Sequence, residues 1–287
     1  MTRRGGWLFA ALCVIWGLPY LFIKIAVATI TPATLVFLRT AIGSALLLPL
    51  AVRTERARVL LPRWRPIVLY TAIEVGLPWL LLSDAERHIS SSLAGLLVAA
   101  VPLAGVIVSR LSGGSHHLDA SGIAGLVVGF AGVAVLLGLD FSGNDWGAIA
   151  KMAMVVVCYA IGPLIISRRL ADLPSLPVVT ASLVLCALAY APAGLAQMPR
   201  SLPAPNVLAA VATLGVICTA LAFVVFFQLI AEVGPIRATV VTYFNPAVAV
   251  FLGVGVLGEP FTWSTATGFV LILAGSFLAT RPSRVRA

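Results

Sequence analysis

The chain has 287 residues, of which 61% are hydrophobic and only 10% are charged, and its mean hydropathy is +1.08. These values lie far from the balance of a soluble globular domain and predict a protein whose solvent is lipid. A net charge of +9 would favour a nucleic-acid partner for a soluble protein. In a membrane protein the positions of the charges, rather than the net charge, indicate what the basic residues do. We therefore expect the lipid bilayer, and no nucleic acid, as a partner.

Ten apolar stretches follow one another along the chain, and each is long enough to cross a bilayer, which takes about 20 residues. They run approximately over residues 6–27, 32–52, 66–84, 89–109, 119–139, 146–167, 175–196, 205–230, 234–257 and 262–280. Because the connections between them are short, no soluble domain fits, and function must lie between the helices. The sequence therefore predicts an all-α polytopic membrane protein with ten transmembrane helices.

The first stretch contains the sequence WGLPYLFIKIA, in which a helix breaker and a charge interrupt an apolar segment. Pro19 removes a backbone donor, so together with Gly17 it predicts a bend whose freed carbonyl needs a partner or a water-lined cavity. Trp16, Tyr20 and Lys24 follow at spacings of four and share one stripe of the helix. This stripe is a candidate wall for a polar ligand, with extension of Lys24 towards the lipid headgroups as the alternative.

The third stretch carries Glu74, the only acidic residue that we place well inside a span. A charge there costs a few kcal/mol, so it needs a partner or a wet cavity. Arg39 on the second stretch is the candidate for an ion pair, and contact with a ligand is the alternative. Pro78 follows Glu74, and Trp79 and Ser83 continue the helix one turn apart, which again indicates a cavity wall.

Two further stretches place prolines where a helix is expected. Pro102 lies in the fourth stretch, and the ninth contains Tyr243, Asn245 and Pro246. Where a proline opens the hydrogen-bond ladder, Asn245 can either repair the backbone or read a ligand.

The sixth and eighth stretches add aromatic residues. Tyr159 precedes Pro163 in the sequence AIGPLIISRRL, and Phe223 and Phe227 lie one helical turn apart. Aromatic stripes of this kind serve either packing or binding, and we include these three aromatic residues in a predicted substrate cavity.

The second half of the chain repeats the first. At an offset of 144 residues the following pairs match: Pro19 with Pro163, Lys24 with Arg168, Ala94 with Ala238, Pro102 with Pro246, and Gly114 with Gly258. We therefore divide the chain into repeats 1–144 and 145–287, each with five spans. An odd number of spans makes the second repeat enter the membrane in the opposite sense. Inverted repeats occur in secondary transporters, whose central sites lie at helices broken by Gly or Pro, so the paired prolines are expected to permit gating.

The basic residues predict the orientation in the membrane. With a cytoplasmic N-terminus, 14 arginines lie on the cytoplasmic side and two, Arg87 and Arg200, on the outer side. Lys24, Arg39 and Lys151 lie within or at the ends of spans. The positive-inside bias therefore predicts that both termini are cytoplasmic.

No pattern indicates an enzyme, a cofactor or a metal site. The four cysteines fall inside predicted spans without metal-ligand spacing, and the three histidines fall in predicted connections. Neither a metalloprotease helix motif nor a nucleophile elbow or a phosphate-binding glycine loop is present in the sequence.

Several motifs resemble those of the EamA family of the drug/metabolite transporter superfamily. They are WG at residues 16–17 followed by Lys24, LR at 38–39, NP at 245–246 and LGEP at 257–260. Within this family the chain is most similar to YddG-type exporters of aromatic amino acids. One departure is that Gly114-Ser115 stands where the second repeat has Gly258-Glu259, so a glutamate often seen in the family is missing from the first repeat.

The resemblance implies ten helices in two inverted repeats, a central cavity, alternating access and export of amino acids or other metabolites through the bacterial inner membrane. The leading hypothesis is export of aromatic or large apolar amino acids. In it Trp16, Tyr20, Trp79, Tyr159 and Tyr243 supply flat surfaces, and Glu74 or Asn245 holds the polar head. The alternatives are efflux of lipophilic cations, and an intramembrane enzyme or scaffold subunit. The sequence leaves the oligomeric state open and is compatible with a monomer.

Overall fold

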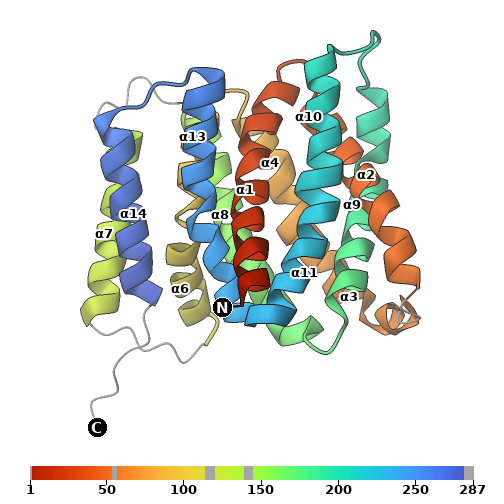
Figure 1. Cartoon of the computed structure of the whole chain (residues 1–287), viewed down its shortest axis with the longest axis horizontal. Coiled ribbons are helices and arrows are strands. Elements are labelled where there is room, and N and C mark those ends of the chain that lie inside the picture. The colour runs from red at the N-terminus through yellow and green to blue at the C-terminus, as the bar shows by residue number, and fades with distance from the viewer. Residues whose placement is uncertain (1, 54–56, 114–119, 139–144, 281–287) are drawn as a thin grey trace.

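The computed structural model describes residues 2–53, 57–113, 120–138 and 145–280, and all regular secondary structure among them is helical (Figure 1). Several residues behind the predictions lie outside the described residues: Gly114, Ser115, two of the histidines, His116 and His117, and four of the 14 arginines predicted to be cytoplasmic, Arg56, Arg281, Arg284 and Arg286.

The helices of the first half are α1 (Arg3–Ala26), α2 (Pro32–Val52), η1 (Ala57–Arg63), α3 (Trp64–Tyr70), η2 (Thr71–Gly76), α4 (Leu77–Ala85), α5 (Ser91–Val98), α6 (Val101–Leu111) and α7 (Ala120–Leu137). Those of the second half are α8 (Trp146–Ile165), η4 (Ile166–Leu170), α9 (Ser175–Ala196), α10 (Pro205–Gly215), η5 (Val216–Leu221), α11 (Ala222–Val233), α12 (Pro235–Ala238), η6 (Thr239–Tyr243), α13 (Asn245–Leu257) and α14 (Trp263–Thr280).

Nine helical segments of the described residues are long and apolar enough to cross a membrane, and Ser121–Leu137 is a shorter apolar helix. The prediction of an all-helical polytopic membrane protein is therefore confirmed. The tenth expected helix corresponds to this shorter helix, which lies within the fifth apolar stretch.

Local sequence determines where several helices start and stop. Thr31, Ser90 and Asp145 each accept a hydrogen bond from a backbone amide in the first turn of the helix that follows. Side-chain oxygens at this position satisfy amides that have no partner within the helix. At the end of α13, Gly258 takes a left-handed conformation with φ 67°, which glycine adopts without strain.

Five membrane segments of the described residues depart from the regular α-helix, four of them in corresponding places of the two halves. The π-helical segment η2 joins α3 to α4, and the π-helical segment η5 joins α10 to α11. A turn at Ala99 and Ala100 separates α5 from α6 directly before Pro102, and the 3₁₀ segment η6 precedes α13, whose first turn contains Pro246. Such departures free backbone groups and commonly mark functional sites.

The expected kink at Gly17 and Pro19 takes a different form. Pro19 lies inside α1, which continues as a single α-helix to Ala26, and Pro163 lies inside α8, which passes into the π-helical η4. A Cβ atom on Gly17 would overlap Val248 of α13. Gly17 therefore permits close helix packing, and we correct its expected role from a kink to a contact.

Corresponding helices of the two halves pack on each other. At one edge of the bundle α7 lies beside α14, and α2 packs on α9 towards the opposite edge (Figure 1). The α7–α14 contact is close because Cβ atoms on Gly125 and Gly275 would overlap the backbone of the partner helix. Lys24 near the end of α1 and Asp145 at the start of α8 both contact the connection between α4 and α5. These contacts agree with the inverted relation of the halves, which stays a prediction.

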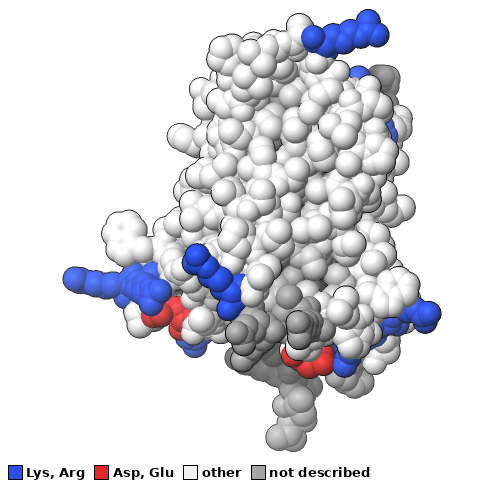
Figure 2. Space-filling view, turned by 90° about the vertical axis from the view of Figure 1, so that its right-hand side faces the viewer, with Lys and Arg blue, Asp and Glu red and all other residues white. Residues whose placement is uncertain are grey.

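On one face of the molecule the charged side chains are gathered at the two ends (Figure 2). On the face drawn in Figure 2, Lys and Arg side chains lie at the two ends, most of them at the end where α1 begins, and a broad uncharged belt separates them. An uncharged belt between charged ends fits the hydrocarbon core of a bilayer.

Candidate functional site

An aromatic cluster joins α1 to α11. The Trp16 ring centroid lies 6.4 Å from that of Phe223 and 4.8 Å from that of Phe226. Phe223 and Phe227 are stacked at 6.1 Å. These distances are typical of favourable aromatic pairs. The structure thus brings together Trp16, Phe223 and Phe227 of the predicted cavity and adds Phe226, which the sequence analysis did not single out.

A buried arginine lies next to this cluster. Only 7% of Arg39 is exposed, its Cζ atom lies 3.7 Å from the centroid of the Trp79 ring, and its Nε donates to Thr219 Oγ1 over 2.9 Å. Thr219 belongs to the π-helical η5 and donates in turn to the Leu214 carbonyl. The cation–π contact and the hydrogen bond together hold the guanidinium in place. Thr219 was missed because its partner lies 180 residues away in sequence.

Glu74 lies in the other π-helical segment, η2. Its Oε2 atom is buried and has no hydrogen-bond partner among the described residues, and a Cβ atom on Gly162 of α8 would overlap the carboxyl group. The predicted ion pair with Arg39 is wrong: among the described residues Glu74 forms no salt bridge, and the guanidinium is held by Trp79 and Thr219 instead. A buried, unpaired carboxyl group is costly unless a ligand or a proton compensates it.

Two tyrosines connect these groups. Tyr159 of α8 packs in the same apolar cluster as Trp79, Phe223 and Phe227, and its hydroxyl lies within electrostatic reach of both Glu74 and Arg39. Tyr20 is buried and within electrostatic reach of Tyr159 and Arg39. The two opposite charges therefore face one region of the bundle, although they do not pair with each other.

Other predicted site residues are engaged elsewhere. In the hydrogen-bonded orientation of its amide, Asn245 donates to the backbone carbonyls of Val241 and Cys13, as the backbone-repair alternative expects. The Tyr243 hydroxyl lies 3.3 Å from Thr280 Oγ1, outside the aromatic cluster. Ser83 donates to the carbonyl of Trp79 within its own helix.

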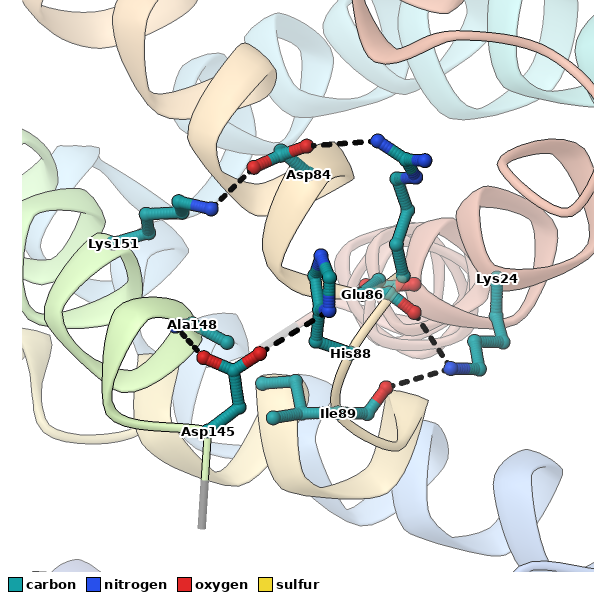
Figure 3. A network of polar contacts seen from close by, with 9 residues as sticks. Lys24, Asp84, Glu86, His88, Ile89, Asp145, Ala148 and Lys151 are labelled. Atoms are coloured by element: carbon teal, nitrogen blue, oxygen red, sulfur yellow. Dashed lines mark hydrogen bonds and ion pairs between the residues drawn. The ribbon is translucent and has the colours of Figure 1, made fainter.

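Lys24 is engaged at the end of α1 by backbone groups of another segment. Its Nζ atom donates to the carbonyls of Glu86 and Ile89, over 2.6 Å and 2.8 Å. These carbonyls belong to the connection between α4 and α5. His88 of this connection and Asp84 at the end of α4 form ion pairs with Asp145 and Lys151 at the start of α8 (Figure 3). Lys24 thus fastens α1 to this connection, a role that needs a contact 62 residues away and is not visible in sequence.

Two hollows of about 390 Å³ and about 280 Å³ lie among exposed apolar side chains such as Trp64 and Phe130. None of the predicted site residues lines either hollow. Their linings are almost wholly apolar, as expected for surfaces that lipid chains cover.

Comparisons with known proteins agree with this architecture. A model of the EamA-like transporter family matches the chain twice, over residues 3–138 and 146–281. The chain is 33% identical over 267 residues to the uncharacterized inner membrane transporter YedA of Escherichia coli (strain K12), covering 87% of this chain and 81% of that protein. It is 25% identical over 280 residues to an uncharacterized transporter of Archaeoglobus fulgidus, covering 96% and 98%.

A protein of known crystal structure shares the fold, with a TM-score of 0.69 and 21% identity over 98% of this chain and 97% of that one. Both halves of the chain match the same family, and the described residues form apolar, membrane-length helices. The chain therefore belongs to the EamA-like transporter family and is a multi-pass membrane transporter.

Proposed function

We propose that this transporter exports amino acids, aromatic and large apolar ones in particular, across a bacterial inner membrane, with both of its termini in the cytoplasm. The observation that carries the proposal concerns the guanidinium of Arg39 and the carboxyl group of Glu74, which lie inside membrane segments, are both within electrostatic reach of Tyr159 and form no ion pair with each other among the described residues. An amino acid carries the same two charges in complementary form.

The guanidinium of Arg39 is suited to the carboxylate of the substrate. Among the described residues its hydrogen bond uses only Nε, while the planar group offers five N–H donors in all. Arginine binds carboxylates through two parallel hydrogen bonds, and stacking on Trp79 fixes the plane in which these bonds form.

Glu74 is suited to the ammonium group. Its Oε2 atom is buried without a partner, and Gly162 gives it the room that any side chain with a Cβ atom would fill. A substrate ammonium would supply the missing hydrogen bond and charge, which lowers the cost of burying the carboxylate.

The aromatic cluster is suited to the substrate side chain. Phe223 and Phe227 pack in the same apolar cluster as Trp79, on which Arg39 stacks, and Trp16 contacts Phe223. Stacking with a substrate ring adds about 0.5–1.5 kcal/mol to simple burial. This arrangement supports the aromatic preference that resemblance to YddG-type exporters implies.

The non-α segments supply places at which the bundle can move. Both halves have a π-helical segment in one membrane segment and a break before a proline in the next. We infer alternating access in which the two halves move against each other around the charged pair.

Efflux of lipophilic cations fits these groups less well. Glu74 would serve as a counter-charge, but the buried guanidinium of Arg39 repels a cation in the same region.

Counterflow in proteoliposomes tests the proposal, because it needs no assumption about energy coupling. Purified protein should exchange labelled phenylalanine and tryptophan faster than small amino acids, and should leave organic cations unexchanged. Exchange of organic cations without amino acids would contradict the proposal.

A further inference from the structure

A second buried carboxyl group lies outside the central site. Glu86 belongs to the connection between α4 and α5, at the end of the bundle that the topology prediction makes external, which we call the outer end. None of its surface is exposed, and neither carboxyl oxygen has a hydrogen-bond partner among the described residues. A residue in a helix connection normally meets water, so complete burial without a partner requires an explanation.

Two charges from other segments lie close to Glu86. Lys24 of α1 donates to the backbone carbonyl of Glu86 over 2.6 Å, so its ammonium lies beside this residue without forming a described ion pair with the carboxyl group. Glu259, which follows α13, accepts from the amides of Ser91 and Ser92 and from Ser92 Oγ at the start of α5. These contacts join α1, α5 and α13 around Glu86.

The remaining charges at the end of α4 and in the connection are paired, two of them with the start of α8 (Figure 3). Asp84 binds both Lys151 and Arg87, and His88 binds Asp145 at 3.1 Å. Arg39 of α2 and Tyr20 of α1 lie within electrostatic reach of Glu86 from the central side. The charges facing Glu86 therefore include two cations, Lys24 and Arg39, and one anion, Glu259.

The balance of these surroundings favours the neutral carboxyl group. Burial raises the pKa of Glu86 well above its usual range, Lys24 lowers it, and Glu259 raises it further. When water reaches the group, the main cause of the shift disappears and the pKa falls towards its ordinary value. Protonation therefore stabilises the buried arrangement at acidic pH, and this stabilisation is lost as the pH rises through the raised pKa.

We propose that Glu86 is a proton-binding site, filled from the outer side when the outer end of the transporter closes and emptied when that end opens. Opening that end must separate at least one of the contacts that join α1, α5 and α13, which lets water hydrate the carboxylate. Acidity outside thus favours the closed outer end. The inference rests on the alternating access of the proposed function but not on the identity of the substrate.

Infrared spectroscopy of the purified protein without substrate tests the protonation directly. On a Glu74→Gln background, which removes the other buried acid, we expect a protonated-carboxyl band at neutral pH that Glu86→Gln abolishes. Glu232→Gln is the matched control, because this glutamate lies at the end of α11 beside Thr2 and should leave the band unchanged. If Glu86→Gln leaves the spectrum at neutral pH unchanged, the carboxyl group is ionised and the proposal is wrong.

If Glu86→Gln does not fold, the protonation of Glu86 can still be tested with variants of the charged residues close to it. Lys24→Gln should raise the pH at which the band disappears and Glu259→Gln should lower it, each by about one pH unit or more. Unmoved midpoints in both variants would also overturn the proposal.

Transport supplies the second measurement. Substrate exchange by the wild-type protein should depend on external pH, and Glu86→Gln should lose most of this dependence while Glu232→Gln keeps it. A dependence that persists in Glu86→Gln contradicts the proposal. Failure of the amino-acid assignment has a different signature, in which amino acids are not exchanged but the infrared result stands.

Discussion

At the scale of single residues, the proposed function depends on two anomalous side chains, Glu74 and Arg39. Hydropathy alone shows that Glu74 and Arg39 are anomalous in apolar stretches, and both were predicted as candidates from sequence. The partners of Arg39 were not predictable, because stacking on Trp79 and bonding to Thr219 depend on how distant helices pack. Glu86 was missed for a related reason: it lies in a connection, and burial of a connection is decided by the tertiary structure.

Replacement of Glu74 separates binding from stability. Because no ion pair with Arg39 is lost, Glu74→Gln should change the free energy of unfolding by less than about 1 kcal/mol. It should weaken the apparent affinity for phenylalanine about tenfold or more, since one charged contact is lost. Thermal unfolding in detergent and counterflow measure the two effects. A loss of about 3–5 kcal/mol would show instead that a buried ion pair had been broken.

The space next to Glu74 offers an independent test. Gly162→Ala places a methyl group where the Glu74 carboxyl lies, so it should displace that side chain, cost about 1–3 kcal/mol and reduce transport. Gly105→Ala is the matched control, since a Cβ atom there meets nothing within 4 Å and the change should be nearly neutral. Transport by Gly162→Ala equal to that of the control would remove Glu74 from the substrate region.

At the scale of elements, hydropathy located the apolar segments well but did not show their internal irregularities. The apolar runs predicted helices because backbone groups in lipid must bond within the segment. The π-helical segments η2 and η5 contain no proline, and the sequence gives no local signal for them. Prolines did mark the breaks before α13 and within the fourth segment, whereas Pro19 lies in a continuous α1.

The breaks can be tested through the prolines that follow them. Pro102→Ala or Pro246→Ala should let regular helix extend across the break, so that the transport rate falls several-fold while the amount of inserted protein is kept. Pro49→Ala in α2 serves as the control, because that proline lies at an exposed position away from any break. Equal losses of rate and of inserted protein would show that the two prolines serve folding alone.

At the scale of the whole molecule, composition and charge placement predicted a polytopic membrane protein, and the repeat predicted two related halves. The family model matches each half separately, which the sequence offset of 144 residues anticipates. The contacts between side chains in the central region could not be predicted, because they depend on how the two halves pack rather than on which residues each half contains.

The predicted orientation in the membrane rests on the arginine imbalance of 14 to 2. Reporter fusions after Arg110 and after Arg286 should both be cytoplasmic, and a fusion within residues 141–145, most of which lie outside the described residues, should be external. An external C-terminal reporter would refute the inverted repeat of two five-span halves.

The central claim is that Arg39 binds the carboxylate and Glu74 the ammonium group of an amino acid. Competition in phenylalanine counterflow tests it most directly, with phenylalanine methyl ester, which lacks the carboxylate, and N-acetylphenylalanine, which lacks the ammonium. Wild-type protein should bind phenylalanine about 10- to 100-fold more tightly than either analogue, because each lost charged contact is worth about 1.5–3 kcal/mol. Arg39→Gln should stop discriminating against the ester, and Glu74→Gln should stop discriminating against the N-acetyl derivative. Competition by both analogues as strong as that of phenylalanine in the wild-type protein would contradict the account.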